Sequence, residues 1–327
     1  MIITLTCNPS LDKTIELDSE LAPGTVQRAR STHVQAAGKG VNVTRALHTA
    51  QAATLALLPG NPNDPLLREL STDSVPHRSL PIDAALRTNI TLVGPHGITT
   101  KINEPGPVLG AETLSQLEQL IVSSILEFNA SWLVLAGSLP PGVPSDYYAQ
   151  LIASLRQQLK DRCPKIAVDT SGAPLRALFA FEPGHVPDLI KPNGHELAEL
   201  AGSRITEAEL EASPQLVAAT SGALLERGTG AVLATLGASG AVLTTAEGSW
   251  VGTHAPVNVR STVGAGDSSL AGYLLADTAG LEPAQKLRWA IAYGSAAAAL
   301  PGSTIPTRDD LRVDAVTVTA LEQLQGS

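Results

Sequence analysis

Short apolar segments alternate with helical patterns along most of the chain after residue 111. Helical patterns at 111–129 and 145–160 precede the apolar segments 132–136 and 165–169, and the same rhythm continues toward the C-terminal part. Short strands separated by helices are typical of right-handed βαβ units, in which helices cover both faces of a parallel sheet. The sequence therefore predicts an α/β fold with a mostly parallel central sheet, and it predicts a helix over 212–226 before the apolar segment 231–235.

Two parts of the chain, approximately 12–35 and 86–104, do not follow this rhythm. They alternate loosely between polar and apolar positions and contain glycine-rich turns. Such alternation is typical of strands that expose one face to solvent. We expect these segments to form an exposed flap inserted in a single domain that spans 1–327.

Composition narrows the class of protein. The chain has 327 residues, a formal net charge of −9 and only two cysteines, Cys7 and Cys163. The acidic balance offers no basic surface for nucleic acid, and two cysteines are too few for a disulfide framework. No apolar run has membrane-spanning length, and residues 1–9 read as a strand rather than a signal peptide. We expect a cytoplasmic protein with no nucleic-acid or membrane partner.

Residues 261–267 place two glycines and an acid at the start of an apolar helical segment. Gly264 and Gly266 flank Ala265 and allow a sharp turn, and Asp267 follows at once. The free amides and the dipole of a helix N-terminus favour an anion at this place. Asp267 would repel a bound phosphate unless it takes a proton from a group that attacks that phosphate. The alternative is that Asp267 only caps its own helix.

A second glycine-rich turn, Gly38-Lys39-Gly40, directly precedes another helical pattern. It is not a P-loop, because the Gly-x4-Gly-Lys-Ser/Thr spacing is absent. A loop amine beside a helix N-terminus can hold a phosphate, and Asn42 on the first turn can face the same ligand. The alternative is a surface turn with a solvated lysine. Arg87, on the second flap segment, is a further cation, although most strand cations are merely solvated.

Polar residues follow the ends of the predicted parallel strands. Because ligands of open α/β sheets bind outside the carboxyl ends of the strands, we expect these residues to line one crevice. They are Ser138, Asp169, Lys191, Asn193, Thr235, Gly237, Ser239 and Gly240. Glu196 could order the waters of a Mg²⁺ ion, or it could stabilise only its own helix. The turn at 237–240 could hold a nucleotide, or it could be a plain hairpin turn.

Together these features favour phosphoryl transfer from ATP with Mg²⁺. Asp267 would accept the proton of the attacking hydroxyl, and the amides of 264–266 would stabilise charge on the transferred group. A closing flap would exclude water and so limit wasteful hydrolysis.

Five ordered motifs carry a resemblance to a known family. They are NPSLD at 8–12, AGKGVN at 37–42, AGSLPPG at 136–142, KPNGHE at 191–196 and STVGAGD at 261–267. In this order they resemble the PfkB family of ribokinase-like carbohydrate kinases, and the resemblance extends to about residue 310. It implies a three-layer α/β/α fold with a mostly parallel central sheet and a small β-sheet lid. In relatives the lid often builds a dimer, so a homodimer through the lid is expected.

The resemblance also implies a role for each candidate residue. Asp267 would be the catalytic base, and Gly264, Ala265 and Gly266 would form the anion hole. Residues expected to hold the sugar substrate are Asp12, Gly38, Lys39, Asn42, Arg87 and Ser138. Residues expected to hold ATP are Lys191, Asn193, Thr235, Gly237, Ser239 and Gly240, with Glu196 acting on Mg²⁺ through water.

The acceptor is suggested by departures within the family pattern. Lys39 is present, whereas Thr25 and Gln27 occupy a part of the flap that is basic in the 6-phosphofructokinases of the family. This resemblance favours phosphorylation of fructose 1-phosphate at its 6-hydroxyl to give fructose 1,6-bisphosphate, with Lys39 and Arg87 at the existing phosphate. Tagatose 6-phosphate or another sugar phosphate is the alternative. A kinase for a neutral sugar or nucleoside and a non-catalytic sugar-phosphate sensor are the competing classes.

Overall fold

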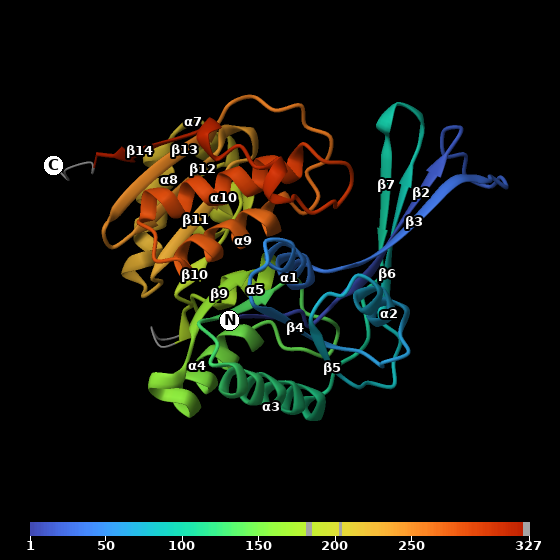
Figure 1. Cartoon of the computed structure of the whole chain (residues 1–327), viewed down its shortest axis with the longest axis horizontal. Coiled ribbons are helices and arrows are strands. Elements are labelled where there is room, and N and C mark those ends of the chain that lie inside the picture. The colour runs from blue at the N-terminus through green and yellow to red at the C-terminus, as the bar shows by residue number, and fades with distance from the viewer. Residues whose placement is uncertain (181–184, 203–204, 323–327) are drawn as a thin grey trace.

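The computed structural model describes residues 1–180, 185–202 and 205–322, whose arrangement is shown in Figure 1. The strands are β1 (Ile2–Leu5), β2 (Ser10–Leu17), β3 (Ala29–Ala37), β4 (Thr54–Pro59), β5 (His77–Leu80), β6 (Arg87–Val93), β7 (Thr99–Asn103), β8 (Trp132–Ala136), β9 (Lys165–Asp169), β10 (Leu189–Ile190), β11 (Ala231–Thr235), β12 (Ala241–Thr245), β13 (Gly248–His254) and β14 (Val316–Leu321). The helices are α1 (Lys39–Thr49), α2 (Pro65–Thr72), α3 (Ala111–Phe128), α4 (Tyr147–Leu159), α5 (Gly172–Ala177), α6 (Gly194–Ala201), α7 (Glu207–Ala212), α8 (Pro214–Glu226), α9 (Ala265–Thr278) and α10 (Pro283–Ala298).

The central sheet has ten strands in the order β14-β13-β12-β11-β10-β9-β8-β1-β4-β5. Strands β11 to β5 in this order are parallel to their neighbours, and β12, β13 and β14 add an antiparallel edge. The carboxyl ends of β8, β9, β10 and β11 therefore meet at one edge of the molecule. The predicted mostly parallel sheet is confirmed.

The alternation of side chains along β8 explains the three layers. Leu133 and Leu135 face a core that includes α3, α4 and α5, whereas Trp132, Val134 and Ala136 face a core that includes α1, α9 and α10. Successive residues of a strand point to opposite faces, so a strand that is apolar at every position requires helices on both sides. Figure 1 shows α3 and α4 below the sheet and α10 across its upper part.

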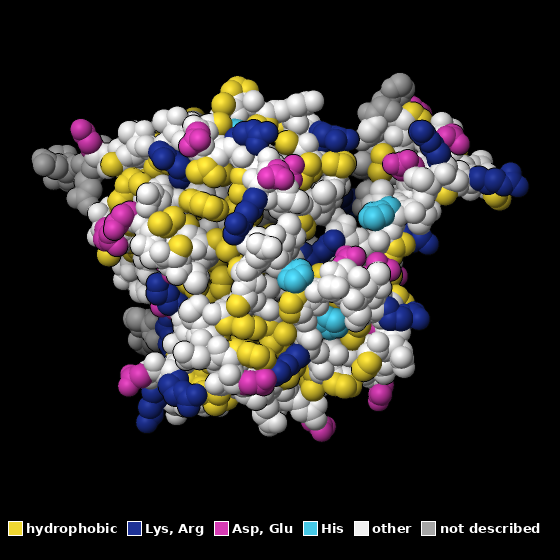
Figure 2. Space-filling model, in the orientation of Figure 1, with side chains coloured by type: hydrophobic (Ala, Val, Ile, Leu, Met, Phe, Trp, Pro, Cys, Tyr) yellow, Lys and Arg dark blue, Asp and Glu magenta, His cyan; other side chains and the backbone are white. Residues whose placement is uncertain are grey.

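A second sheet has the order β3-β2-β6-β7 and forms the arm that projects from the body in Figure 1. β2 and β6 are parallel, and β3 and β7 pair antiparallel at the two sides. At its base, Ala36 and Leu86 pack with α2 in a small core of their own. Figure 2 shows the arm separated from the upper body by a notch.

The local structure differs from the sequence-based predictions in three respects. The short helix α7 was not predicted, and the helix expected over 212–226 begins instead at Pro214, as α8. Ser213 caps α8 through its Oγ, which accepts from the amide of Leu216, and Pro214 occupies the first helical position. Proline lacks an amide hydrogen and suits this position. Strand β14 was not predicted at all. No helix in the described ranges is long and apolar enough to cross a membrane.

Candidate active site

The turn that precedes α9 lies at the carboxyl edge of the central sheet. Gly264 is the N-cap of α9 with φ of 76°, a left-handed conformation that glycine adopts without strain. The helix begins at Ala265, so Gly266 and Asp267 belong to its first turn. The amide of Ser268 donates to the carbonyl of Gly264 at 2.9 Å, and those of Gly266 and Asp267 have no backbone partner in the described part of the chain. Two free amides therefore point from this turn, as an anion site requires.

Asp267 is buried, with 7% of its surface exposed. Its Oδ2 accepts a hydrogen bond of 2.7 Å from Nδ2 of Asn42, the one side-chain donor recorded for it within the described residues. Burial raises the pKa of Asp267 to about 6, and the nearby charge of Asp169 adds to the rise, although Asn42 and two lysines lower it. A carboxylate with a pKa near neutrality can accept a proton and remains ionised at physiological pH.

Asp169, at the end of β9, holds two lysines beside this carboxylate. Its Oδ1 lies 2.6 Å from Nζ of Lys39, and its Oδ2 lies 3.1 Å from Nζ of Lys191. Burial raises the pKa of Asp169, but the two lysine charges outweigh burial and hold it below its usual value. The pKa of Lys39 is raised, because Asp169, Glu196 and Asp267 together outweigh burial. Lys39 therefore remains charged, and Asp169 holds both lysines in ion pairs within the crevice.

Lys191 also connects the ion pairs to the anion turn. A Cβ on Gly266 would lie 3.2 Å from Nζ of Lys191, so the ammonium group lies against the backbone of the turn. Lys39 is the first residue of α1, and Gly38 is its N-cap with φ of 121°. The two glycine-rich turns thus meet, and each brings a cation and a helix N-terminus to the same place.

The candidate sugar residues of the lid lie at its base and are hydrogen-bonded to one another. Oδ1 of Asp12 accepts from Oγ of Ser10 at 2.8 Å and from Nδ2 of Asn89 at 3.0 Å. Nη2 of Arg87 donates to the carbonyl of Asn8 at 3.0 Å, and Nη1 donates to that of Glu104 at 3.3 Å. Arg87 therefore supports the base of the lid with part of its guanidinium group.

Ser138 joins this group through Asn8. Nδ2 of Asn8 donates to Oγ of Ser138 at 3.3 Å and to the carbonyl of Pro105 at 3.1 Å. Three amide oxygens, those of Asn8, Asn42 and Asn89, are buried without a hydrogen-bond partner in the described ranges. Buried polar atoms are rarely unpaired in proteins, so these oxygens mark acceptors for the donors of a ligand, such as hydroxyl groups.

The candidate nucleotide residues lie at the ends of β10 and β11. Asn193 caps α6, since its Oδ1 accepts from the amide of Glu196 and Oε2 of Glu196 accepts from the amide of Asn193, both at 2.8 Å. The amide of Thr235 donates to the carbonyl of Pro192 at 2.9 Å, which joins the two strand ends. Glu196 thus caps its own helix with one carboxylate oxygen, and its other oxygen is left for the waters of a Mg²⁺ ion.

Residues 237–240 form the turn from β11 to β12. Gly237 and Ser239 lie in a single 3-10 turn, and the amide of Leu236 donates to the carbonyl of Gly240 at 2.8 Å. No hydrogen bond within the described ranges joins this turn to Asp169 or Asp267. It shares the carboxyl edge with them, because β11 ends there.

The carboxylates of the crevice fit a water-coordinated Mg²⁺ rather than a metal held by a protein cage. No group of three or more His, Cys, Asp or Glu side chains able to hold a metal occurs in the described part of the chain. Oε1 of Glu196 accepts no hydrogen bond from a described residue, so it can face a hydrated ion. Mg²⁺ usually keeps several waters and takes one or two carboxylates together with substrate phosphates.

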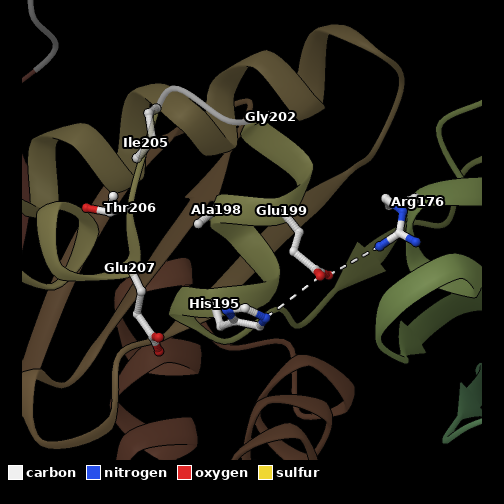
Figure 3. Close-up of a pocket in the computed structure, with 8 residues that line it drawn as sticks. All are labelled: Arg176, His195, Ala198, Glu199, Gly202, Ile205, Thr206 and Glu207. Carbon is white, nitrogen blue, oxygen red and sulfur yellow. Dashed lines mark ion pairs between the residues drawn. The ribbon is translucent and has the colours of Figure 1, made fainter.

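A cavity of about 360 Å³ lies beside the α6 cap, on the outer side of that helix. Figure 3 shows His195 and Arg176 pointing to opposite sides of the Glu199 carboxylate, at 3.7 Å and 3.6 Å. Glu207 of α7 borders the same cavity and contacts Gly194. Arg176 is paired with Glu199, and none of the lining residues belongs to the predicted site.

The comparisons with known proteins agree with this arrangement. The family model described as pfkB family carbohydrate kinase matches residues 6–310. A protein of Xanthomonas campestris pv. campestris named 1-phosphofructokinase is 36% identical over 294 residues, which cover 87% of each chain. Phosphofructokinase-2 from Escherichia coli, solved in complex with potassium, has a TM-score of 0.83 and 28% identity over 94% of this chain and 96% of its own. A ribokinase from Thermotoga maritima has a TM-score of 0.70 and 19% identity over 96% and 98%, a likeness of fold.

A buried carboxylate in a glycine-rich turn, on a three-layer ribokinase-like fold with a smaller second sheet, agrees with a phosphotransferase. The chain belongs to the PfkB family of carbohydrate kinases.

Three polar residues of the crevice were not assigned roles from sequence. Asp169 was recognised only as a strand end, and its pairing with both lysines was not foreseen. Asn8 lies in a motif that carries the family resemblance, and Asn89 lies on a flap strand. A signal existed for Asn8 and Asp169, because both follow buried strands, but Asn89 resembles any polar residue of an exposed strand.

Proposed function

We propose that the protein transfers the γ-phosphoryl group of ATP to the 6-hydroxyl of fructose 1-phosphate, giving fructose 1,6-bisphosphate and ADP. The observation that carries this proposal is Asp267, a buried carboxylate with a pKa of about 6 in the first turn of α9. It belongs to the turn that would hold the phosphate, and its Oδ2 accepts from Asn42, a candidate residue of the sugar site. Relatives named 1-phosphofructokinase support the choice of acceptor.

In the proposed reaction, Asp267 accepts the proton of the 6-hydroxyl while the oxygen attacks the γ-phosphorus. The bond from this phosphorus to the β–γ bridging oxygen breaks, and ADP leaves. The free amides at Gly266 and Asp267, together with Lys191, stabilise negative charge on the transferred group. Mg²⁺, when bound through water to Glu196, would supply further positive charge at the phosphates.

The sugar would lie between Asn42 and the base of the lid. The unpaired amide oxygens of Asn8, Asn42 and Asn89 would accept hydrogen bonds from its hydroxyls, and Asp12 would accept one through its free oxygen. Lys39 would reach the 1-phosphate only if it exchanges part of its bond to Asp169. We therefore assign Arg87 and Lys39 jointly to this phosphate.

A homodimer through the lid is part of the proposal, and apolar side chains on the lid support it. Val26, Ile98 and Ile102 are exposed by 97%, 61% and 52%. Apolar side chains exposed on a projecting arm favour a partner, and a second copy of the lid is the simplest one. Sedimentation velocity would measure it: a dimer for the wild-type protein, and a shift toward monomer for Ile102→Glu. The two free cysteines are consistent with a cytoplasmic location.

A substrate panel tests the reaction. Fructose 1-phosphate, fructose 6-phosphate, tagatose 6-phosphate and fructose would be compared at equal concentrations by ADP release, and the product would be assigned by phosphorus NMR. We expect the highest kcat/KM with fructose 1-phosphate. A higher value with tagatose 6-phosphate or fructose 6-phosphate would reassign the acceptor, and a higher value with fructose would contradict a phosphate site at Lys39 and Arg87. Asp267→Asn is the control for contaminating kinases.

A further inference from the structure

A smaller cavity lies at the ends of α1 and α9 that are remote from the active site. It has a volume of about 180 Å³ and lies between these helix ends, α10 and the short 3-10 helix Arg308–Asp310. α1 and α9 begin at Lys39 and Ala265 in the active site, so both helices run from the crevice to this cavity. A ligand bound in this cavity would therefore contact two helices whose first turns belong to the active site.

The lining of the cavity is apolar with one charged group. Leu275, Ala276 and Leu281 form part of the walls, and Trp289 and Tyr293 contribute a stacked aromatic pair with centroids 6.1 Å apart. The hydroxyl of Tyr293 has no hydrogen-bond partner in the described part of the chain. Aromatic walls with a few polar groups are typical of sites for small organic ligands.

Arg308 supplies the charge. Its Nη2 donates to the carbonyl of Ala50 at 3.3 Å, and it forms no ion pair with any residue of the described ranges. Burial raises the pKa of the Tyr293 hydroxyl and the charge of Arg308 lowers it, so the two groups lie within electrostatic range. In the larger cavity of Figure 3, by contrast, Arg176 is already neutralised by Glu199. Arg308 therefore retains its capacity to bind an anion.

We propose that this cavity binds a small carboxylate with an apolar body about the size of one aromatic ring. A cavity of roughly 150 Å³ lined by apolar side chains accommodates benzene, so the volume suits such a body. The planar guanidinium of Arg308 would hold the carboxylate, and the Tyr293 hydroxyl is a second donor. The lining of Leu, Ala and aromatic side chains selects against a purely polar anion.

Close backbone contacts join this cavity to the anion turn. A Cβ on Gly272 of α9 would lie 2.6 Å from the carbonyl oxygen of Trp289, and a Cβ on Gly294 of α10 would lie 3.3 Å from that of Ala265. The two helices thus touch without intervening side chains, once beside the cavity and once at the first residue of α9. A ligand that fixes Trp289 also restrains the start of α9, and binding at the two places is linked.

The test uses benzoate as the probe and calorimetry as the readout. Benzamide replaces the charge with a neutral group of similar shape, and acetate keeps the charge without the apolar body. Of the three compounds, we expect only benzoate to bind saturably. Arg308→Gln should lower the affinity for benzoate about tenfold or more, since a hydrogen bond to a charged group contributes this much. Arg312→Gln is the matched control, because Arg312 is an exposed arginine outside the cavity whose Nη1 bonds only to the carbonyls of Asp309 and Leu311.

Several results would overturn the proposal. They are an absence of saturable binding up to the solubility limit, equal affinity for benzoate and benzamide, and equal weakening by the two arginine variants. If Arg308→Gln does not fold, Ala279→Leu, which adds bulk at the cavity wall, replaces it and should weaken the binding of benzoate to at least the same extent. For the linkage, saturation with benzoate should slow hydrogen exchange of the amides at 266–268. Unchanged exchange would overturn the transmission to the anion turn.

Discussion

Two aspartates of helix α9 have opposite environments. Asp267 lies in the first turn, accepts one side-chain hydrogen bond from Asn42, and has a pKa raised to about 6 by burial. Asp277 lies in the last turn and accepts from Lys286 at 2.8 Å, from Trp132 at 2.9 Å and from Lys165 at 3.1 Å. Burial works against ionised Asp277 as well, but these partners outweigh it and lower its pKa.

The comparison shows how one helix carries a structural and a reactive carboxylate. Asp277 is fully paired, so its charge stabilises the fold and its basicity is lost. Asp267 has too few partners for a buried charge, so the fold is less stable when it is ionised, and the carboxylate gains basicity in return. A loss of stability of this kind is expected where a buried carboxylate serves as a general base.

The largest expected effect is a loss of kcat on substitution of Asp267 but not of Asp277. Asp267→Asn removes the proton acceptor and should lower kcat by about 10²- to 10⁴-fold, the usual contribution of a general base. ATP affinity should be retained, because the anion turn is intact. Asp277→Asn should leave kcat near the wild-type value. Steady-state kinetics with ATP and fructose 1-phosphate measure both, and a similar loss in the two variants would remove the distinction.

The second prediction concerns the stability supplied by Asp277. Asp277→Asn leaves Lys286 and Lys165 without their carboxylate and should lower the free energy of unfolding by about 1–3 kcal/mol at neutral pH. The pKa of Asp277 is lowered in the folded state, so its contribution is present above the ordinary aspartate pKa and is lost as pH falls through the folded value. Urea unfolding at about pH 7 and at about pH 3 should show a smaller difference at the lower pH. An equal difference at both pH values would point to lost packing instead.

The third prediction has the opposite sign. The pKa of Asp267 is raised in the folded state, so ionisation on raising the pH through about 6 destabilises the fold. Asp267→Asn cannot ionise and should be more stable than the wild-type protein at about pH 8, by about 1–2 kcal/mol. The gain should vanish at about pH 4, where Asp267 is protonated. A variant that is less stable than the wild-type protein at about pH 8 would contradict the account.

The smallest expected effects are shifts in the pH profile of kcat/KM, on its acidic limb. Asn42→Ala removes the donor that stabilises ionised Asp267 and should move this limb to higher pH by less than about one unit. Asp169→Asn removes a negative charge that raises the pKa, and it releases Lys39 and Lys191, so the limb should move to lower pH. Shifts in the same direction for the two variants would show that the limb does not report Asp267.

The sequence was sufficient for the parts of the site that lie within one motif. Gly264, Gly266 and Asp267 are contiguous, and a turn followed by an apolar helix has few possible geometries. The central strands were also predictable, because each apolar segment between helices can only be a buried strand. The short helix α7 was not predicted, and the start of α8 was expected at 212 although Pro214 marks it, because the apolar pattern continues across this position.

Long-range pairing could not be predicted from local patterns. Asp169, Lys39 and Lys191 come from different elements, and only the fold shows that one carboxylate neutralises both lysines. For the same reason Lys39 was expected to be free for a phosphate. The parallel pairing of β2 with β6, which brings Asn89 beside Asp12, likewise depends on two segments far apart in the chain.

The most direct test of the account is the carboxyl titration of Asp267 and Asp277 in the free protein. Carbon NMR of aspartate-labelled protein, with signals assigned from Asp267→Asn and Asp277→Asn, would follow both groups in one sample. We predict that Asp267 titrates with a pKa of about 6 and that the pKa of Asp277 lies below the ordinary aspartate pKa. Titration of Asp267 at or below the ordinary value would contradict the assignment of this residue as the poised base.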